Sequence, residues 1–157
     1  MALEQIVANT RREVAQRMRD VPEGFLRQGL QPSTRSLAEA LAGEQTAFIL
    51  ECKKASPSRG VIRPDFDLAA IAAQYRPFAA AISVLTDQHF FQGSHEYLRQ
   101  ISQWCPQPVL CKDFIVEPYQ VVEARAHGAD AVLLMLSVLD DGQYRRCAEA
   151  AAALSLD

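Results

Sequence analysis

The sequence predicts an α/β protein built around a parallel β-sheet. From about residue 46 onward, a strand-length apolar run followed by an amphipathic helix pattern occurs four times. The apolar runs are almost uninterrupted, which is typical of parallel strands that are covered on both faces. A chain of 157 residues that is 49% hydrophobic and 22% charged can form one such globular domain.

Two helices are expected before the repeating units begin. The first covers residues 3–21 and carries a single apolar stripe between its charged positions. The stripe consists of Leu3, Ile6, Val7, Val14, Met18 and Val21. A glycine- and proline-containing loop over residues 22–29 follows. Ser36 and Glu39 then have capping-box spacing, which predicts a second helix that stops near Gly43.

The first two repeating units extend to about residue 104. Residues 47–53 form the first expected strand, and Asp67 is placed to cap the helix that follows it. Residues 80–85 form the second expected strand, and Ser94 is placed to cap its helix.

The third and fourth units complete the pattern. Residues 108–114 form the third expected strand, and Pro118 suits the first turn of the next helix. Residues 131–136 form the fourth strand, and Asp140 or Asp141 caps the last helix.

Two architectures fit four consecutive strand–helix units: a doubly wound open sheet, and part of a (β/α)₈ barrel. A complete barrel typically takes roughly 250 residues, whereas this sequence reaches Asp157 as the fourth helix pattern finishes. The barrel interpretation therefore predicts a half barrel in residues 46–157, preceded by a helical extension in residues 1–45.

Composition excludes several classes of function. The formal net charge is −3 with both signs mixed along the chain, so we expect no nucleic-acid partner. No apolar stretch approaches the ~20 residues of a membrane helix, and no signal peptide is visible, so we expect a cytoplasmic protein. The four cysteines have no C-x-x-C spacing and no nearby histidine pattern, which indicates reduced thiols and no metal site.

Charged residues stand at strand ends where the pattern predicts burial. Glu51 and Lys53 share one face of the first strand, and Lys112 lies near the end of the third. The carboxyl ends of the strands form the site in barrels and in open sheets alike. Two lysines and a glutamate suit an anionic substrate that needs proton transfer. Phe91 and Phe114 are placed to supply a flat wall for an aromatic ring.

Simpler structural interpretations of these residues remain open at this point. Glu51 and Lys53 also fit an ion pair at a strand end. Lys112 also fits an ordinary strand terminus, and Phe91 a loop anchor. The serine at Ser56 belongs to a Ser-Pro-Ser stretch that by itself is a turn.

Four segments together resemble the indole-3-glycerol-phosphate synthase family. They are FILECKKASPS at residues 48–58, SVLTDQHFFQGS at 83–94, PVLCKDFIV at 108–116 and GADAVLL at 128–134. Their order and spacing agree with the family, and the resemblance covers essentially the whole chain. It implies a (β/α)₈ barrel lyase of tryptophan biosynthesis that uses no metal or organic cofactor.

The resemblance also implies a reaction and a role for each candidate residue. The family closes the indole ring of a carboxyphenylamino-deoxyribulose phosphate and releases carbon dioxide and water. Lys112 matches the general acid, Lys53 a lysine that binds anionic groups and helps in proton transfer, and Glu51 a glutamate that assists dehydration. Ser56 matches a substrate-contacting serine. The pocket around the anthranilate ring is matched by Phe91, Phe114 and Leu133.

The family's later strands have no counterpart in this sequence. They carry a glutamate, an asparagine, a glutamate–serine pair and the phosphate site of the complete barrel. We therefore expect the N-terminal half of a synthase, inactive alone because catalytic residues act as a unit, with open sheet edges that favour self-association. The alternative is a non-catalytic anion-binding or assembly module that keeps Lys53 and Lys112.

Overall fold

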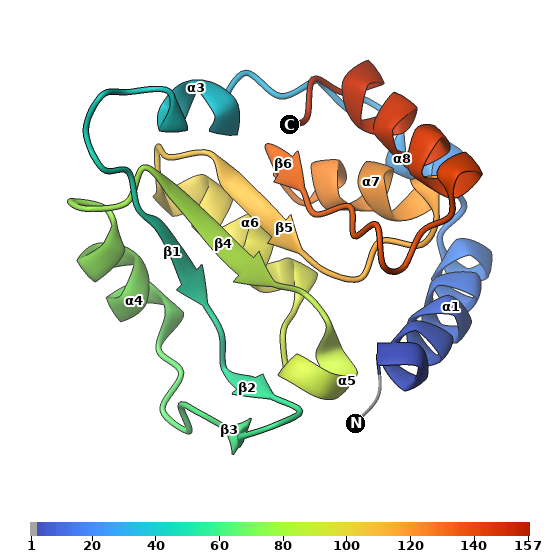
Figure 1. The fold of residues 1–157 in the computed structure, drawn as a ribbon, viewed down its shortest axis with the longest axis horizontal. Coiled ribbons are helices and arrows are strands. Elements are labelled where there is room, and N and C mark those ends of the chain that lie inside the picture. The colour runs from blue at the N-terminus through green and yellow to red at the C-terminus, as the bar shows by residue number, and fades with distance from the viewer. Residues whose placement is uncertain (1–2) are drawn as a thin grey trace.

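The computed structural model describes residues 3–157, and its centre is a four-stranded parallel sheet. The strands lie side by side in the order β1 (Ile49–Cys52), β4 (Ala81–Leu85), β5 (Val109–Lys112) and β6 (Ala131–Val132) (Figure 1). This order follows the chain without reversal. A doubly wound sheet reverses its strand order at a switch point, so the observed order is the one that a barrel-type fold has.

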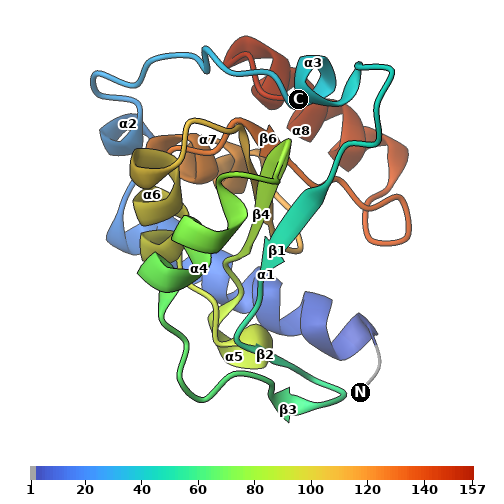
Figure 2. The ribbon, with the colours of Figure 1, turned by 90° about the vertical axis from the view of Figure 1, so that its left-hand side faces the viewer.

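Helices follow the strands and cover one face of the sheet. They are α4 (Leu68–Tyr75), α6 (His95–Trp104), α7 (Pro118–Ala126) and α8 (Asp141–Ala153). Figure 2 shows α4 and α6 on one side of β1 and β4. The main core lies in this layer, where strand residues such as Ile82 and Val109 pack with Leu98 and Ile101 of α6. Burying apolar side chains of this size stabilises the fold by ~1.5–3 kcal/mol each.

The predicted helix starts are confirmed by their caps. The Asp67 carboxylate accepts the N–H of Ala70 in the first turn of α4, and the Ser94 hydroxyl accepts an N–H in the first turn of α6. Asp140 accepts the N–H of Gln143 at 2.7 Å and so starts α8. Each cap satisfies a backbone donor that has no partner within the helix, worth about 1 kcal/mol.

Three strands are shorter than the sequence pattern predicts. The predicted strand at residues 47–53 is reduced to β1, that at 108–114 to β5, and that at 131–136 to β6. Each edge strand has only one neighbour in the sheet, so part of its apolar run makes no ladder hydrogen bonds. The start of the first run is also not core, since Phe48 and Ile49 are 55% and 42% exposed.

Three small elements were not predicted because they are too short to show a periodicity. They are the helix α2 (Glu23–Leu26), the hairpin of β2 (Ala55–Ser56) with β3 (Gly60–Val61), and the helix α5 (Gln88–Phe91). The hairpin and α5 lie within the first two strand-to-helix connections, at the carboxyl ends of the strands (Figure 1).

The N-terminal helix α1 (Leu3–Asp20) packs on α7, whereas α3 (Leu37–Leu41) is a single short turn. Val14 of α1 is buried against Tyr119, whose hydroxyl donates to the carbonyl oxygens of Arg17 and Val21 at 3.3 and 3.0 Å. Met18 and Val21 are 42% and 36% exposed, so the predicted apolar stripe is buried only over its N-terminal part.

The four cysteines are buried free thiols. Burial raises the pKa of Cys52 to about 12, which keeps this thiol protonated and unreactive at neutral pH. None of the helices described within residues 3–157 is long and apolar enough to cross a membrane.

Candidate active site

Three charged side chains converge at the carboxyl ends of β1 and β5. One Glu51 oxygen lies 2.8 Å from the Lys53 ammonium, and the other lies 2.7 Å from the Lys112 ammonium. The register explains the meeting, because Glu51 is level with Ser83 of β4 and Lys112 is level with Leu85, on the same face. A single carboxylate therefore bridges two lysines across the central strand.

The two lysines determine the charge state of Glu51. Partial burial raises the pKa of this carboxyl, but hydrogen bonds and charge from Lys112 and Lys53 outweigh burial and hold the pKa below its ordinary value. The side chain of Glu51 is 25% exposed, and those of the lysines are 36% and 41% exposed. The group is therefore ionised at neutral pH and still open to a ligand.

An apolar cavity of about 200 Å³ adjoins the three charges. The rings of Phe91 and Phe114 form one wall, with centroids 6.1 Å apart and planes tilted by 40°. Leu133 also lines the cavity, as do Glu51 and both lysines. A pocket with a flat apolar wall and a few convergent polar groups is the usual form of a small-molecule site.

Ser56 is the candidate residue that does not line this cavity. It lies in the β2–β3 hairpin, and its hydroxyl is 3.5 Å from that of Ser58. The hairpin contacts α5, the helix that carries Phe91. Ser56 is thus in the same loop layer as the pocket but faces its own turn.

Three further residues line the cavity and were missed by sequence reasoning. They are Leu85, Asp113 and Met135. Strand alternation could have predicted Leu85, because it lies two residues after Ser83 and therefore on the same face of β4. Met135 lies beyond the end of β6, where no alternation rule applies, and Asp113 follows directly after Lys112.

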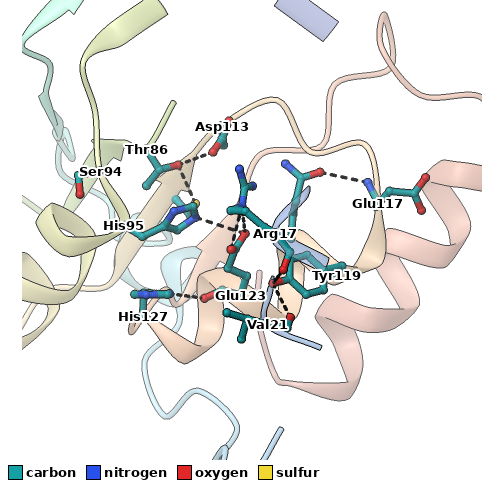
Figure 3. Close-up of polar contacts among 12 residues, drawn as sticks. Arg17, Val21, Thr86, Ser94, His95, Asp113, Glu117, Tyr119, Glu123 and His127 are labelled. Carbon is teal, nitrogen blue, oxygen red and sulfur yellow. Dashed lines mark hydrogen bonds and ion pairs between the residues drawn. The ribbon is translucent and has the colours of Figure 1, made fainter. Parts of the chain in front are cut away.

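A second polar cluster joins α1, α6 and α7 (Figure 3). The Arg17 guanidinium Nε lies 2.9 and 3.1 Å from the two carboxylate oxygens of Glu123. His95 Nε2 is 3.7 Å from the same carboxylate, and the His95 ring lies 5.0 Å from that of His127. Burial lowers the pKa of His95 to about 4, so its imidazole is neutral at pH 7.

The described residues do not form an evident metal site. Within residues 3–157, no three His, Cys, Asp or Glu side chains group in a way that could hold an ion. What the pocket does offer is the Glu51 carboxylate as a base, two ammonium groups as acids or anion ligands, and an apolar surface for a ring.

A parallel sheet in chain order, with a lysine-lined and aromatic-walled pocket at its carboxyl end, defines an α/β protein that is consistent with the barrel class and carries a candidate site at the usual place of that class. The comparison with known families is more specific. The family model described as indole-3-glycerol phosphate synthase matches residues 3–157. The chain therefore belongs to the indole-3-glycerol phosphate synthase family.

Individual relatives agree with this assignment. The chain is 55% identical over 154 residues to the tryptophan biosynthesis protein TrpCF of Salmonella typhi, an alignment that covers 98% of this chain and 34% of that protein. The TrpCF proteins of Vibrio parahaemolyticus and Yersinia pestis are 53% and 51% identical, again over 98% of this chain and 32% of theirs. The chain thus spans about a third of the length of the curated relatives it matches.

Proposed function

We propose that this chain supplies part of the active site of an indole-3-glycerol-phosphate synthase. The substrate would be 1-(2-carboxyphenylamino)-1-deoxyribulose 5-phosphate, and the product indole-3-glycerol phosphate. The observation that carries the proposal is the Glu51 carboxylate held between Lys53 and Lys112, beside the Phe91–Phe114 wall. This combination suits an aromatic ring that bears anionic groups and reacts by proton transfer.

Each group has a step that its chemistry fits. A ring carbon of the substrate bonds to the ketone carbon, and Lys112 donates a proton to the ketone oxygen as negative charge develops there. The ring carbon then loses its carboxyl group as carbon dioxide. The new hydroxyl group leaves as water after taking up a second proton, and Glu51 removes the proton whose loss completes the indole. Lys53 binds anionic groups of the substrate and assists these transfers.

The remaining candidates would position the substrate. Phe91, Phe114 and Leu133 would contact the anthranilate ring, because they form the apolar side of the cavity. Ser56 would contact the substrate only after the β2–β3 hairpin moves, since its hydroxyl now faces Ser58.

We further propose that residues 46–157 are half of a (β/α)₈ barrel and that residues 1–45 are a helical extension. Two observations support this division. The sheet follows chain order, and its helix-free face is lined by Ile49, Leu110 and Leu133 around an open groove of about 360 Å³. In a closed barrel the corresponding side chains fill the interior.

Turnover followed by indole fluorescence tests the function. We expect no product from the 157-residue chain alone and product when a C-terminal half from a relative is added. In that mixture, Lys112→Ala should lower the rate at least ~100-fold, the usual range for a lost general acid. Lys54→Ala is the matched control, because Lys54 does not line the cavity, and it should leave the rate unchanged.

Two results would contradict the proposal, and each would refute a different part of it. Binding of the substrate without turnover, even with the C-terminal half present, would favour the non-catalytic anion-binding module. Full turnover by the Lys112→Ala mixture would refute the assignment of Lys112 as the acid.

A further inference from the structure

Two buried aspartates follow neighbouring strands at the edge of the candidate pocket. Asp87 lies two residues beyond β4, and Asp113 directly follows β5, its paired neighbour. Their residues are only 5% and 8% exposed. The proposed chemistry uses neither of them.

The Asp87 carboxylate fixes the turn that carries Phe91. Its Oδ1 accepts the backbone N–H groups of Phe90 and Phe91 at 2.7 and 3.1 Å and thereby caps α5. The end of this turn is equally constrained, because a Cβ on Gly93 would lie 2.3 Å from the Leu85 carbonyl oxygen. The backbone of Phe91 is therefore held at both ends of a four-residue helix.

The Asp113 carboxylate does the same for Phe114. Its Oδ1 accepts the backbone N–H of Phe114 at 2.7 Å. Its Oδ2 accepts the Thr86 hydroxyl, also at 2.7 Å, as Figure 3 shows. Thr86 directly precedes Asp87, so the two aspartates belong to one hydrogen-bonded unit that joins the ends of β4 and β5.

Burying these two carboxylates with no cationic partner among the described residues costs free energy, which points to a functional role. Among residues 3–157, neither carboxylate has a lysine, arginine or histidine nitrogen within ion-pair distance. Burial raises the pKa of Asp113 and that of Asp87, and the pKa of Asp87 is raised further by the charge of Asp113. Violations of ordinary burial rules concentrate at functional sites, and the partners of these two groups are the backbones of the pocket phenylalanines and one threonine.

We propose that Asp87 and Asp113 are positioning residues that set the two phenylalanine rings of the pocket before a ligand arrives. The ring-binding purpose rests on the proposed function, whereas the positioning itself follows from the hydrogen bonds. Because the two phenylalanine rings are already held in place, they lose less conformational entropy when a ligand binds. Both aspartates line a second cavity of about 240 Å³ beside α1, and Asp113 borders the candidate pocket as well.

The test compares Asp87→Ala and Asp113→Ala with Asp87→Asn and Asp113→Asn in the full chain. At Asp87 a single oxygen accepts both N–H groups, so asparagine keeps the acceptor and should rescue what alanine loses. At Asp113 the asparagine oxygen can still accept the N–H of Phe114, and the Thr86 hydroxyl can turn to accept from the new amide group. The first readout is the NMR contact between the Phe91 and Phe114 rings, together with the amide signals of Phe90, Phe91 and Phe114. The second is the dissociation constant of anthranilate, a fluorescent aromatic carboxylate.

We expect each alanine variant to lose the ring contact and to weaken anthranilate binding about fivefold, and both asparagine variants to resemble the parent chain. Asp87→Ala should leave the Phe114 amide signal unchanged, which shows that the variant is folded. Asp67→Ala is the matched control, because Asp67 caps α4 away from the pocket, and it should alter neither readout.

The outcomes separate the two claims. A ring contact that persists in both alanine variants would overturn the positioning role. Asparagine variants that behave like alanine would overturn it as well, because charge rather than hydrogen-bond geometry would then be what matters. A parent chain that keeps the ring contact but binds no anthranilate would refute the ring-binding function and leave the positioning role supported.

Discussion

Glu51 determines the electrostatic balance of the pocket because it contacts two lysines at once. Its two oxygens lie within 2.8 Å of the Lys53 and Lys112 ammonium groups. The carboxylate offsets one of the two positive charges and so reduces the repulsion between the lysines in this partly apolar pocket. It also competes with any anionic ligand for both lysines.

Glu51→Gln should therefore have opposite effects on binding and on turnover. Removing the negative charge frees both lysines, so we expect anthranilate to bind about threefold to tenfold more tightly, an ordinary size for one charge contact near a surface. Turnover in the presence of a C-terminal half should fall, because the base is lost. Fluorescence titration and initial rates measure the two effects. Weaker anthranilate binding in Glu51→Gln would contradict this account of the pocket.

At the scale of elements, Asp130 joins the N-terminal segment to the sheet. This residue is 1% exposed, and its carboxylate contacts Arg35 at 2.7 Å, Arg125 at 3.2 Å, the Ser33 hydroxyl at 2.6 Å and the backbone N–H of Val109 at 2.9 Å. The carboxylate thus ties the segment before α3 to α7 and to the start of β5.

Asp130→Ala should destabilise the chain by about 3–5 kcal/mol, because two cations lose their partner and the N–H of Val109 loses its acceptor. Urea unfolding followed by circular dichroism measures the change. Glu96→Ala is the control, since Glu96 and Arg99 form an exposed pair on α6, and its unfolding midpoint should match that of the parent chain. A small effect of Asp130→Ala would mean that the N-terminal segment is not anchored through this carboxylate.

A second element-scale contact depends on pH. His95 of α6 faces Glu123 on α7, His127 just after the end of α7, and Arg17 on α1 (Figure 3). Burial lowers its pKa to about 4, below the value of about 6.5 in an unfolded chain. Between these values the unfolded state binds the proton and the folded state does not, so stability falls as the pH falls.

The free energy of unfolding should accordingly decrease by about 2 kcal/mol between pH 7 and pH 5 through His95 alone. Urea titrations at the two pH values measure the decrease, and His95→Gln should remove this part of it. His89→Gln serves as the control because His89 is exposed on α5. An unchanged pH dependence in His95→Gln would show that other groups are responsible.

At the scale of the whole molecule, the helix-free face of the sheet carries an open groove. Ile49, Leu110 and Leu133 line its groove. The hydroxyl of Ser83, in the same face, is buried without a hydrogen-bond partner among the described residues. Polar atoms are rarely left so in a completed core. Two edge strands, β1 and β6, flank this face.

We predict that the isolated chain self-associates through this face and its edges. Size-exclusion chromatography with light scattering should detect dimers or larger species, and Ile49→Lys should shift them toward the monomer. Phe78→Lys is the control, since Phe78 is 71% exposed but lies outside the groove. A stable monomer of the parent chain at all concentrations would refute the prediction.

Much of the fold could be predicted because its signals are local. The apolar runs identified all four strands of the parallel sheet, and Asp67, Ser94 and Asp140 correctly marked helix starts. Strand alternation also put Glu51 and Lys53 on one face. The lengths of β1, β5 and β6 were overestimated, because pairing depends on neighbours in space that a linear pattern does not contain.

The sequence by itself determined the parallel α/β class, the family and the strand ends that carry charge, because periodicity, caps and motifs are properties of neighbouring residues. Only the tertiary structure decided that Glu51 bridges both lysines, that Ser56 faces its own turn, and that Asp113 holds Phe114. These contacts depend on strand register and loop geometry. Both arise from packing between segments distant in the chain, and that packing sets distances that no local pattern encodes.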